Sequence, residues 1–274
     1  MPILEPYKAA EDTWVLPSYL PVAGFGNIVV NSHLILAREP VLVDTGMPVV
    51  REEFLAALWS LVEPRDLRWI MLTHDDGDHT GALAKIMEAA PQAPIVTQYI
   101  GFARLETALH LDPHRFVIKN PGEGLPLGDR TLQLLRPPLF DSPATTAIFD
   151  PRSRVLFSAD SFGAFIPEVT QDVGDIAPAD YAQGFGIFNY ANHPWSVLVD
   201  RAKFDVQLEA IRRLDPAVIA SCHSPMARGR TAEHLAAMAR IPDSEPLPGP
   251  DQQAFQAFIS DLEHDQSSGV SPAH

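Results

Sequence analysis

The stretch Thr73-His74-Asp75-Asp76-Gly77-Asp78-His79-Thr80-Gly81 carries two histidines and three aspartates within six residues. It follows the apolar run Trp69-Ile70-Met71-Leu72 directly and precedes a run with helical periodicity. Ligands commonly converge where a strand ends and a helix begins in layered α/β folds. Imidazole nitrogens and carboxylate oxygens are ligands for zinc, iron and manganese, and so many acidic groups together would be costly without a cation. The stretch therefore predicts a metal site in preference to a solvated acidic turn.

Composition sets the broad class of this 274-residue chain. Hydrophobic residues make up 46% and charged residues 20%, which is typical of a soluble globular protein. The formal net charge is −15, and because nucleic acids and anionic membranes attract basic surfaces, we expect neither as a partner. There is no signal-peptide pattern and no long apolar stretch, so a cytoplasmic location is expected. The single cysteine excludes an intrachain disulfide and zinc sites built from thiolates.

Short apolar runs alternate with helical patterns, which predicts sheets covered by helices. Strands are expected at 27–36, 41–43, 69–72, 94–99, 131–135, 145–149, 155–158 and 218–220. Helices are expected at 52–61, 81–90 and 231–240, and around 204–211. The segment 162–199 is rich in Gly, Pro and aromatic residues and shows little periodicity, so we expect an irregular insertion that covers a pocket. We expect one domain over 1–265 and a flexible tail at 266–274.

The acidic stretch resembles the His-x-His-x-Asp-His signature of the metallo-β-lactamase superfamily, and further motifs of that superfamily follow in order. They are Asp44 in Val43-Asp44-Thr45-Gly46, Asp160 in Phe157-Ser158-Ala159-Asp160, and His223 in Ser221-Cys222-His223-Ser224-Pro225. The resemblance extends from about residue 25 to residue 230. It implies an α+β fold, the αββα sandwich, with a two-metal site at the edge of its sheets.

The sequence departs from the superfamily pattern at two positions. Asp76 stands where the signature has its second histidine, and Asp141, counted back from the hairpin residue Asp150, stands where another histidine is usual. Flavodiiron proteins also use a carboxylate at the first position, and the stand-alone oxygen-binding di-iron protein of bacterial chemotaxis has an Asp at the second. The chain is therefore most similar to the di-iron core of these proteins. It contains no flavodoxin domain, so no built-in flavin is expected.

The resemblance implies three imidazoles and four carboxylates around two metal ions, with Asp160 as the bridge. The first ion would take His74, Asp76 and Asp141, and the second Asp78, His79 and His223. An oxygen-rich set favours iron over zinc, with manganese as the third alternative. Asp44 would support the metal-binding loop through its histidines, although a simple turn residue at a strand end is an equal alternative.

Outside the proposed ligands, several residues could have either a functional or a purely structural role. Tyr190, His193 and Trp195 are expected either to cover the metals as a pocket wall or to pack as a plain loop. Asp75 is expected to point to solvent. We interpret Cys222 as a small buried residue in preference to a redox-sensitive thiol. His33 is expected to be a hydrogen-bonded histidine of the core or pocket.

Three functions agree with these residues. The favoured one is a non-haem di-iron protein that binds or reduces dioxygen or nitric oxide, with electrons from an external reductase. The alternatives are a metal-dependent hydrolase that uses a bridging hydroxide, and a non-catalytic metal-dependent sensor. The sequence thus leaves enzymatic activity open. Flavodiiron proteins pair so that one chain's flavin reaches the other's irons, a reason for pairing that disappears without a flavodoxin domain, so a homodimer is left open only as a possibility.

Overall fold

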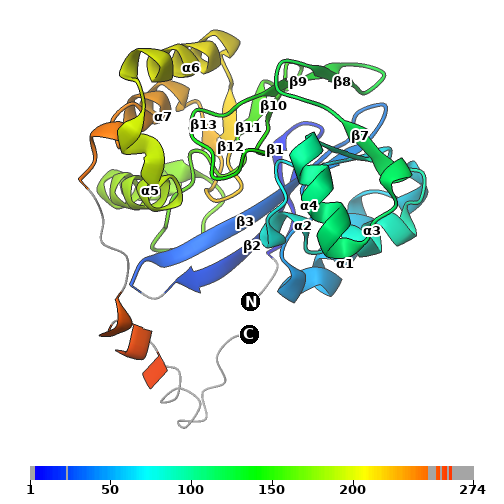
Figure 1. The fold of residues 1–274 in the computed structure, drawn as a ribbon, viewed down its shortest axis with the longest axis horizontal. Coiled ribbons are helices and arrows are strands. Elements are labelled where there is room, and N and C mark those ends of the chain that lie inside the picture. The colour runs from blue at the N-terminus through cyan, green and yellow to red at the C-terminus, as the bar shows by residue number, and fades with distance from the viewer. Residues whose placement is uncertain (1–3, 23, 246–250, 254, 258, 261–274) are drawn as a thin grey trace.

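The structure is a computed structural model that describes residues 4–22, 24–245, 251–253, 255–257 and 259–260. Two sheets lie between two groups of helices (Figure 1), which confirms the predicted αββα sandwich. The predicted tail at 266–274 lies outside the described residues. None of the described helices has the length and apolar character needed to cross a membrane.

The first sheet has seven strands in sequence order. They are β1 (Tyr7–Ala10), β2 (Thr13–Val22), β3 (Gly26–Ile35), β4 (Val41–Val43), β5 (Trp69–Met71), β6 (Ile95–Thr97) and β7 (Phe116–Ile118). Strands β1 to β4 pair antiparallel, whereas β4 to β7 pair parallel. The carboxyl ends of β4 and β5 therefore meet at one edge, which brings Asp44 close to the start of the acidic stretch.

The second sheet has six strands in the order β13-β12-β11-β10-β9-β8. They are β8 (Gly124–Pro126), β9 (Thr131–Leu135), β10 (Ala147–Asp150), β11 (Val155–Phe157), β12 (Val218–Ala220) and β13 (Ala227–Arg228). Strands β11 and β12 are parallel, with Phe157 opposite Ala220. Asp160 and His223 follow these two strands by three residues each, so parallel pairing places both at the same edge.

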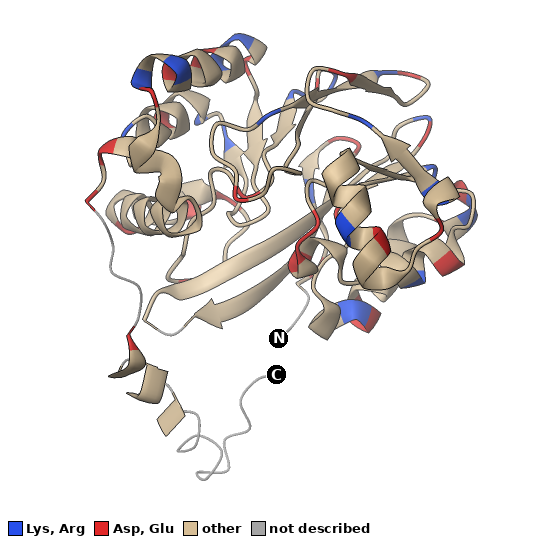
Figure 2. Cartoon of the chain, in the orientation of Figure 1, with Lys and Arg blue, Asp and Glu red and all other residues tan. Residues whose placement is uncertain are grey.

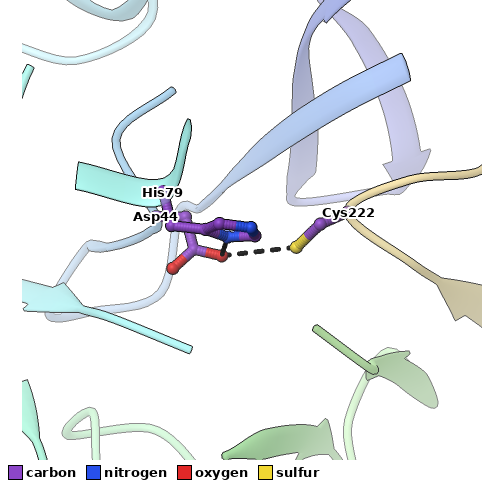
Figure 3. Close-up of side chains that lie close together, drawn as sticks. All are labelled: Asp44, His79 and Cys222. Atoms are coloured by element: carbon purple, nitrogen blue, oxygen red, sulfur yellow. Dashed lines mark hydrogen bonds and ion pairs between the residues drawn. The ribbon is translucent and has the colours of Figure 1, made fainter. Parts of the chain in front are cut away.

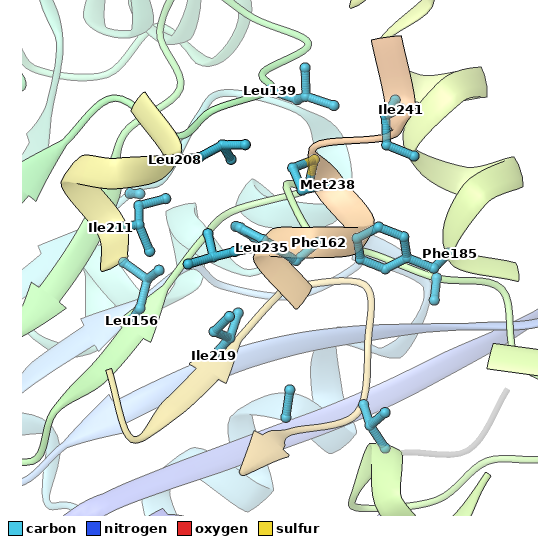
Figure 4. Packing of buried hydrophobic residues seen from close by; sticks show 14 of the residues in the cluster. Leu139, Leu156, Phe162, Phe185, Leu208, Ile211, Ile219, Leu235, Met238 and Ile241 are labelled. Atoms are coloured by element: carbon cyan, nitrogen blue, oxygen red, sulfur yellow. The ribbon is translucent and has the colours of Figure 1, made fainter. Parts of the chain in front are cut away.

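Apolar side chains fill the space between the sheets and beneath the helices. The inter-sheet core includes Val15, Ile35, Val43, Ile148 and Phe157. Helices α1 (Arg51–Leu61), α2 (Gly77–Thr80), α3 (Leu83–Ala89) and α4 (Tyr99–Leu109) belong to the half with the first sheet. Helices α5 (Pro178–Asn192), α6 (Arg201–Leu214) and α7 (Thr231–Met238) belong to the other half. Figure 4 shows the core beneath these last helices, where side chains of α6 and α7 pack against β11 and β12.

The segment 162–199 is less irregular than the sequence suggests, because it contains the 15-residue helix α5. The buried side chains of Phe185 and Phe188, with Tyr181 one turn earlier, form the apolar face of this helix. Two glycines interrupt the pattern and obscured it. A Cβ at one of them, Gly184, would lie 1.8 Å from the carbonyl oxygen of Phe165, so a close backbone approach requires the glycine.

Gly81 fixes the position of α2 against the loop that follows β4. Its N–H donates to the carbonyl of Gly46, and a Cβ would lie 2.2 Å from the nitrogen of Pro48. We expect Gly81→Ala to destabilise the metal-free protein by about 1–3 kcal/mol, since backbone atoms must move to relieve the clash. The midpoint temperature of thermal unfolding should fall by several degrees. Gly77→Ala is the control, because nothing lies within 4 Å of a Cβ there. If both variants lowered the midpoint temperature equally, close packing at Gly81 could not be the cause.

Candidate metal centre

At one edge of the sandwich, the acidic stretch after β5 meets the segments that follow β11 and β12 and the loop between β9 and β10. His74 follows β5, while α2 supplies Asp78 and His79. Asp160 follows β11, His223 follows β12, and Asp141 lies on the loop between β9 and β10. Figure 2 shows acidic stretches on the loops beside α2, whereas charges of both signs are mixed on the outer helices. All seven proposed ligands belong to connected groups whose donor atoms lie within 4.8 Å of one another.

The first group is centred on Nε2 of His74. This nitrogen lies 3.8 Å from Oδ2 of Asp76 and 3.6 Å from Oδ2 of Asp141. The Asp76 side chain is 54% exposed, but that of Asp141 only 16%, so the group opens to solvent on the Asp76 side. Both aspartates that replace the expected histidines therefore lie beside the same imidazole.

The second group contains Asp78, His79 and His223. Oδ2 of Asp78 lies 3.5 Å from Nε2 of His79 and 3.4 Å from Nε2 of His223. Asp160 lies between the two groups. Its Oδ1 is 3.2 Å from Nε2 of both His79 and His223 and 3.8 Å from Nε2 of His74.

In two of the histidines, a contact of the other ring nitrogen, Nδ1, fixes the tautomer of the imidazole. Nδ1 of His223 donates to the carbonyl of Val29 at 3.0 Å, and Nδ1 of His79 lies 3.0 Å from Oδ2 of Asp44. These contacts leave Nε2 unprotonated in the neutral rings and directed at the centre, as metal-bound histidines require. Nε2 of His74, Nε2 of His79 and Oδ1 of Asp160 are buried without a hydrogen-bond partner.

This geometry fits metal ions. Buried polar atoms without partners are costly, and a cation bound between them would satisfy all three. Ligands about 2.1 Å from one ion are separated by roughly 3–3.5 Å at tetrahedral or octahedral angles, close to the separations observed here. The combined set of imidazoles and carboxylates contains no thiolate, which suits iron, manganese or zinc.

Burial and neighbouring charges shift the pKa values of the metal-free centre. Burial alone would raise the pKa of Asp160, but the charges of His223, His74 and His79 hold it well below its usual value. Burial alone would lower the pKa of His223, but Asp160 and Asp78 raise it to about 9. The pKa of His79 is likewise raised, against the effect of burial, by Asp44. Metal ions must therefore displace protons, so affinity should increase with pH.

Asp44 connects the acidic stretch with the loop after β12 (Figure 3). Its Oδ1 accepts from the N–H of Thr73, and its Oδ2 accepts from the Thr73 hydroxyl, both at 2.7 Å. Oδ2 also contacts Nδ1 of His79 and, at 3.3 Å, Sγ of Cys222. The carboxylate is 1% exposed, and burial raises the pKa of the Cys222 thiol, so this sulfur stays protonated as a donor.

Helix α5 and the segment after it contact the centre at two places. Nδ2 of Asn192 donates to Oδ2 of Asp160 at 3.1 Å. In η5 (Pro194–Leu198), Nε1 of Trp195 donates to the carbonyl of Phe140, next to Asp141. Trp195 thus holds the loop that carries Asp141.

His193 and Tyr190 are both buried. Nδ1 of His193 donates to the carbonyl of Asn189, and its Nε2 has no hydrogen-bond partner. Burial lowers the pKa of His193, which keeps the ring neutral although Asp160 and Asp141 act in the opposite direction. The pocket role of Tyr190, His193 and Trp195 remains a prediction.

The expectation for Asp75 is wrong, and that for His33 is right about its burial in the core but wrong about its hydrogen bonds. Asp75 does not point to solvent, because its side chain is 8% exposed and lies 3.3 Å from Nη1 of Arg104, which also contacts Ser142. His33 is buried against Phe157, but neither ring nitrogen has a hydrogen-bond partner, and burial lowers its pKa to about 4. Sequence reasoning missed Thr73, Asn192 and Arg104, whose partners lie far away along the chain.

An αββα sandwich with imidazoles and carboxylates at one edge defines the metallo-β-lactamase class of fold. The chain belongs to the metallo-beta-lactamase superfamily, whose sequence profile matches residues 26–223. It is similar to an uncharacterized protein of Methanocaldococcus jannaschii, with 28% identity over 70% of this chain and 48% of that protein. It is also similar to the type A flavoprotein fprA of Rhodobacter capsulatus, with 29% identity over 77% of this chain and 48% of the relative.

A nitric oxide reductase of Moorella thermoacetica is 27% identical over 77% of this chain and 52% of its own length. The chain thus spans about half the length of the curated relatives it matches. Among solved structures, rubredoxin oxygen:oxidoreductase of Desulfovibrio gigas gives a TM-score of 0.78 at 20% identity, over 88% of this chain and 62% of that one. Fragment 1–254 of a putative diflavin flavoprotein of Nostoc gives a TM-score of 0.73 at 21% identity, over 94% of this chain and 97% of the fragment. These structures share the fold.

Proposed function

We propose that this chain is a non-haem di-iron protein that binds or reduces dioxygen or nitric oxide. The observation that carries the proposal is the position of Asp76 and Asp141, both beside Nε2 of His74. With Asp78 and Asp160, they make a set of four carboxylates and three imidazoles. Such an oxygen-rich set favours iron over zinc. Two proteins similar to this chain, the nitric oxide reductase of Moorella thermoacetica and the structural neighbour rubredoxin oxygen:oxidoreductase, support this ligand class.

The charge of the proposed site favours a small neutral ligand. Four carboxylates balance two divalent cations, so the loaded centre would be neutral. Among the described residues, the carboxylates proposed as ligands form ion pairs with histidines only. The nearby Arg104 is engaged with Asp75 and Ser142. An anionic substrate such as a phosphate ester would therefore find no free guanidinium or ammonium group of these residues at the carboxylates.

When bound, two ferrous ions would supply electrons and open coordination positions for a diatomic ligand. The protein's contribution is to position these groups. Asp160 would hold the separation of the two sites, with its Oδ2 fixed by Asn192. Asp44 fixes the tautomer of His79, and the buried residues of α5 would restrict access to small molecules. Electrons would come from an external reductase.

Metal analysis combined with ligand titration tests the proposal. Protein from iron-supplemented cells should contain about two irons per chain and show visible charge-transfer absorption. The reduced protein should change its optical spectrum on anaerobic addition of nitric oxide and be oxidised by dioxygen. Two zinc ions with turnover of a chromogenic ester would overturn the proposal in favour of the hydrolase. Bound iron that responds to neither gas would also contradict it.

Asp141→His tests whether this carboxylate sets the metal preference. The substitution replaces an oxygen ligand by an imidazole beside His74, so we expect the zinc-to-iron ratio at fixed metal supply to rise several-fold. Metal analysis after growth in equal iron and zinc measures the ratio. Asp66→His, at an exposed position in the turn before β5, is the control for an added histidine. An unchanged ratio in Asp141→His would remove Asp141 from the ligand set.

A further inference from the structure

A recess lies between η4 (Val173–Asp175), α5 and α7, and its lining includes none of the proposed metal ligands. Its volume is about 230 Å³, below the roughly 300–1,000 Å³ of pockets that hold drug-sized ligands. Ile176, Phe185 and Ala237 supply apolar lining, and Arg230 and Arg240 contribute charged groups. Phe185 also belongs to the core shown in Figure 4, so this wall is continuous with the packed interior. The recess therefore suits a small ligand with an apolar body.

The polar groups of the inner wall are already paired, which makes the recess preformed. Nδ1 of His234 donates to the carbonyl of Arg230 at 3.0 Å, so its Nε2 accepts from the Tyr181 hydroxyl at 2.9 Å. The Tyr181 oxygen in turn lies 3.1 Å from Oγ of Ser224. Burial lowers the pKa of His234, which keeps this ring neutral. A ligand would thus meet a rigid wall that has no unpaired polar group on His234 or Tyr181 to satisfy.

Two positively charged side chains and one negatively charged side chain line the recess. Nη1 of Arg230 pairs with Oε2 of Glu233 at 2.8 Å. Arg240 is exposed and has no ion-pair partner among the described residues. The recess therefore carries one unbalanced positive charge in a chain whose formal net charge is −15. A guanidinium beside an apolar wall can bind a carboxylate through charge-assisted hydrogen bonds.

We propose that this recess binds a small apolar monocarboxylate, with its ring or short chain against Phe185 and Ala237 and its carboxylate at Arg240. The apolar lining accounts for the body of the ligand, and the unpaired guanidinium accounts for the single negative charge. Small size follows from the volume of the recess. The site is separate from the metal centre, and the proposal does not depend on which metal the chain holds.

Calorimetric titration of the purified, metal-loaded protein with benzoate tests the proposal, with benzamide as the uncharged probe of the same shape. Benzoate should bind saturably with a Kd below about 1 mM, and benzamide at least about tenfold more weakly. Arg240→Gln should weaken benzoate binding about tenfold and leave benzamide binding unchanged. Ala237→Phe should abolish binding of both probes, because the new ring fills the recess.

Lys203→Gln is the matched control, since it removes one positive charge from a side chain of α6 that is 86% exposed. It should leave benzoate binding unchanged. Equal weakening by Lys203→Gln and Arg240→Gln would show a general charge effect and overturn the site, as would equal affinities for benzoate and benzamide. Absence of saturable binding at millimolar benzoate would also overturn it. Arg240 is exposed, so its variant is expected to fold even if Ala237→Phe does not.

Discussion

Asp160→Asn should reduce the metal content from about two ions per chain to one or fewer. Oδ1 of Asp160 lies within 3.8 Å of Nε2 of all three proposed histidine ligands, so this oxygen is shared by both groups. Asparagine has almost the same shape, but its neutral amide is a poor ligand and balances no cationic charge. Metal analysis of protein purified under identical metal supply measures the loss. For an iron-loaded sample, the visible absorption should fall in parallel.

Asp75→Asn is a stringent control for this result, because Asp75 belongs to the same acidic stretch. Its carboxylate faces Arg104 instead of the imidazoles, so the variant should keep its full metal content. If Asp160→Asn retained both ions, Asp160 could not be the bridge. If Asp75→Asn lost as much metal, the effect would reflect the acidity of the loops in general and not ligation by one carboxylate.

The sequence predicted those parts of the structure that depend on local pattern. The strands at 41–43 and 218–220 agree with β4 and β12 in both bounds, because short apolar runs bounded by turn residues indicate buried strands. The residues proposed as ligands could be singled out because strand ends and a motif of fixed spacing carry them, and the structure brings them into connected groups. Asp141 was found only by counting from Asp150 with the help of the superfamily pattern, since one aspartate in a loop is no signal by itself.

What the sequence did not predict depends on contacts between distant segments. Helix α5 was hidden because Gly184, which packs against the Phe165 carbonyl, breaks the apolar pattern. The burial of Asp75 follows from Arg104, 29 residues later, and the fixation of Asp160 follows from Asn192, 32 residues later. Spacing along the chain carries no information about such pairs. The same holds for His33, whose ring contacts Phe157 in the opposite sheet and has no hydrogen-bond partner.

Asp44→Asn should lower metal affinity about 10- to 100-fold without removing a ligand. Asp44 has a φ of 60°, a conformation that asparagine tolerates well, so the substitution changes the carboxylate and little of the backbone. In the variant an amide group would face Nδ1 of His79 and donate to it. This nitrogen would then accept, the ring proton would move to Nε2, and the atom directed at the metal would lose its free electron pair. Chelator competition followed by metal analysis measures the affinity.

The metal-free form of Asp44→Asn should also lose about 1–3 kcal/mol of folding free energy, because Asp44 accepts from buried groups of Thr73, His79 and Cys222. Cys222→Ala is the matched control, since it removes only the S–H donor at 3.3 Å, the weakest of these contacts. We expect its metal affinity to change much less than that of Asp44→Asn. An unaltered affinity in Asp44→Asn would show that Asp44 is a turn residue at the end of β4 and that the tautomer of His79 is fixed by other means.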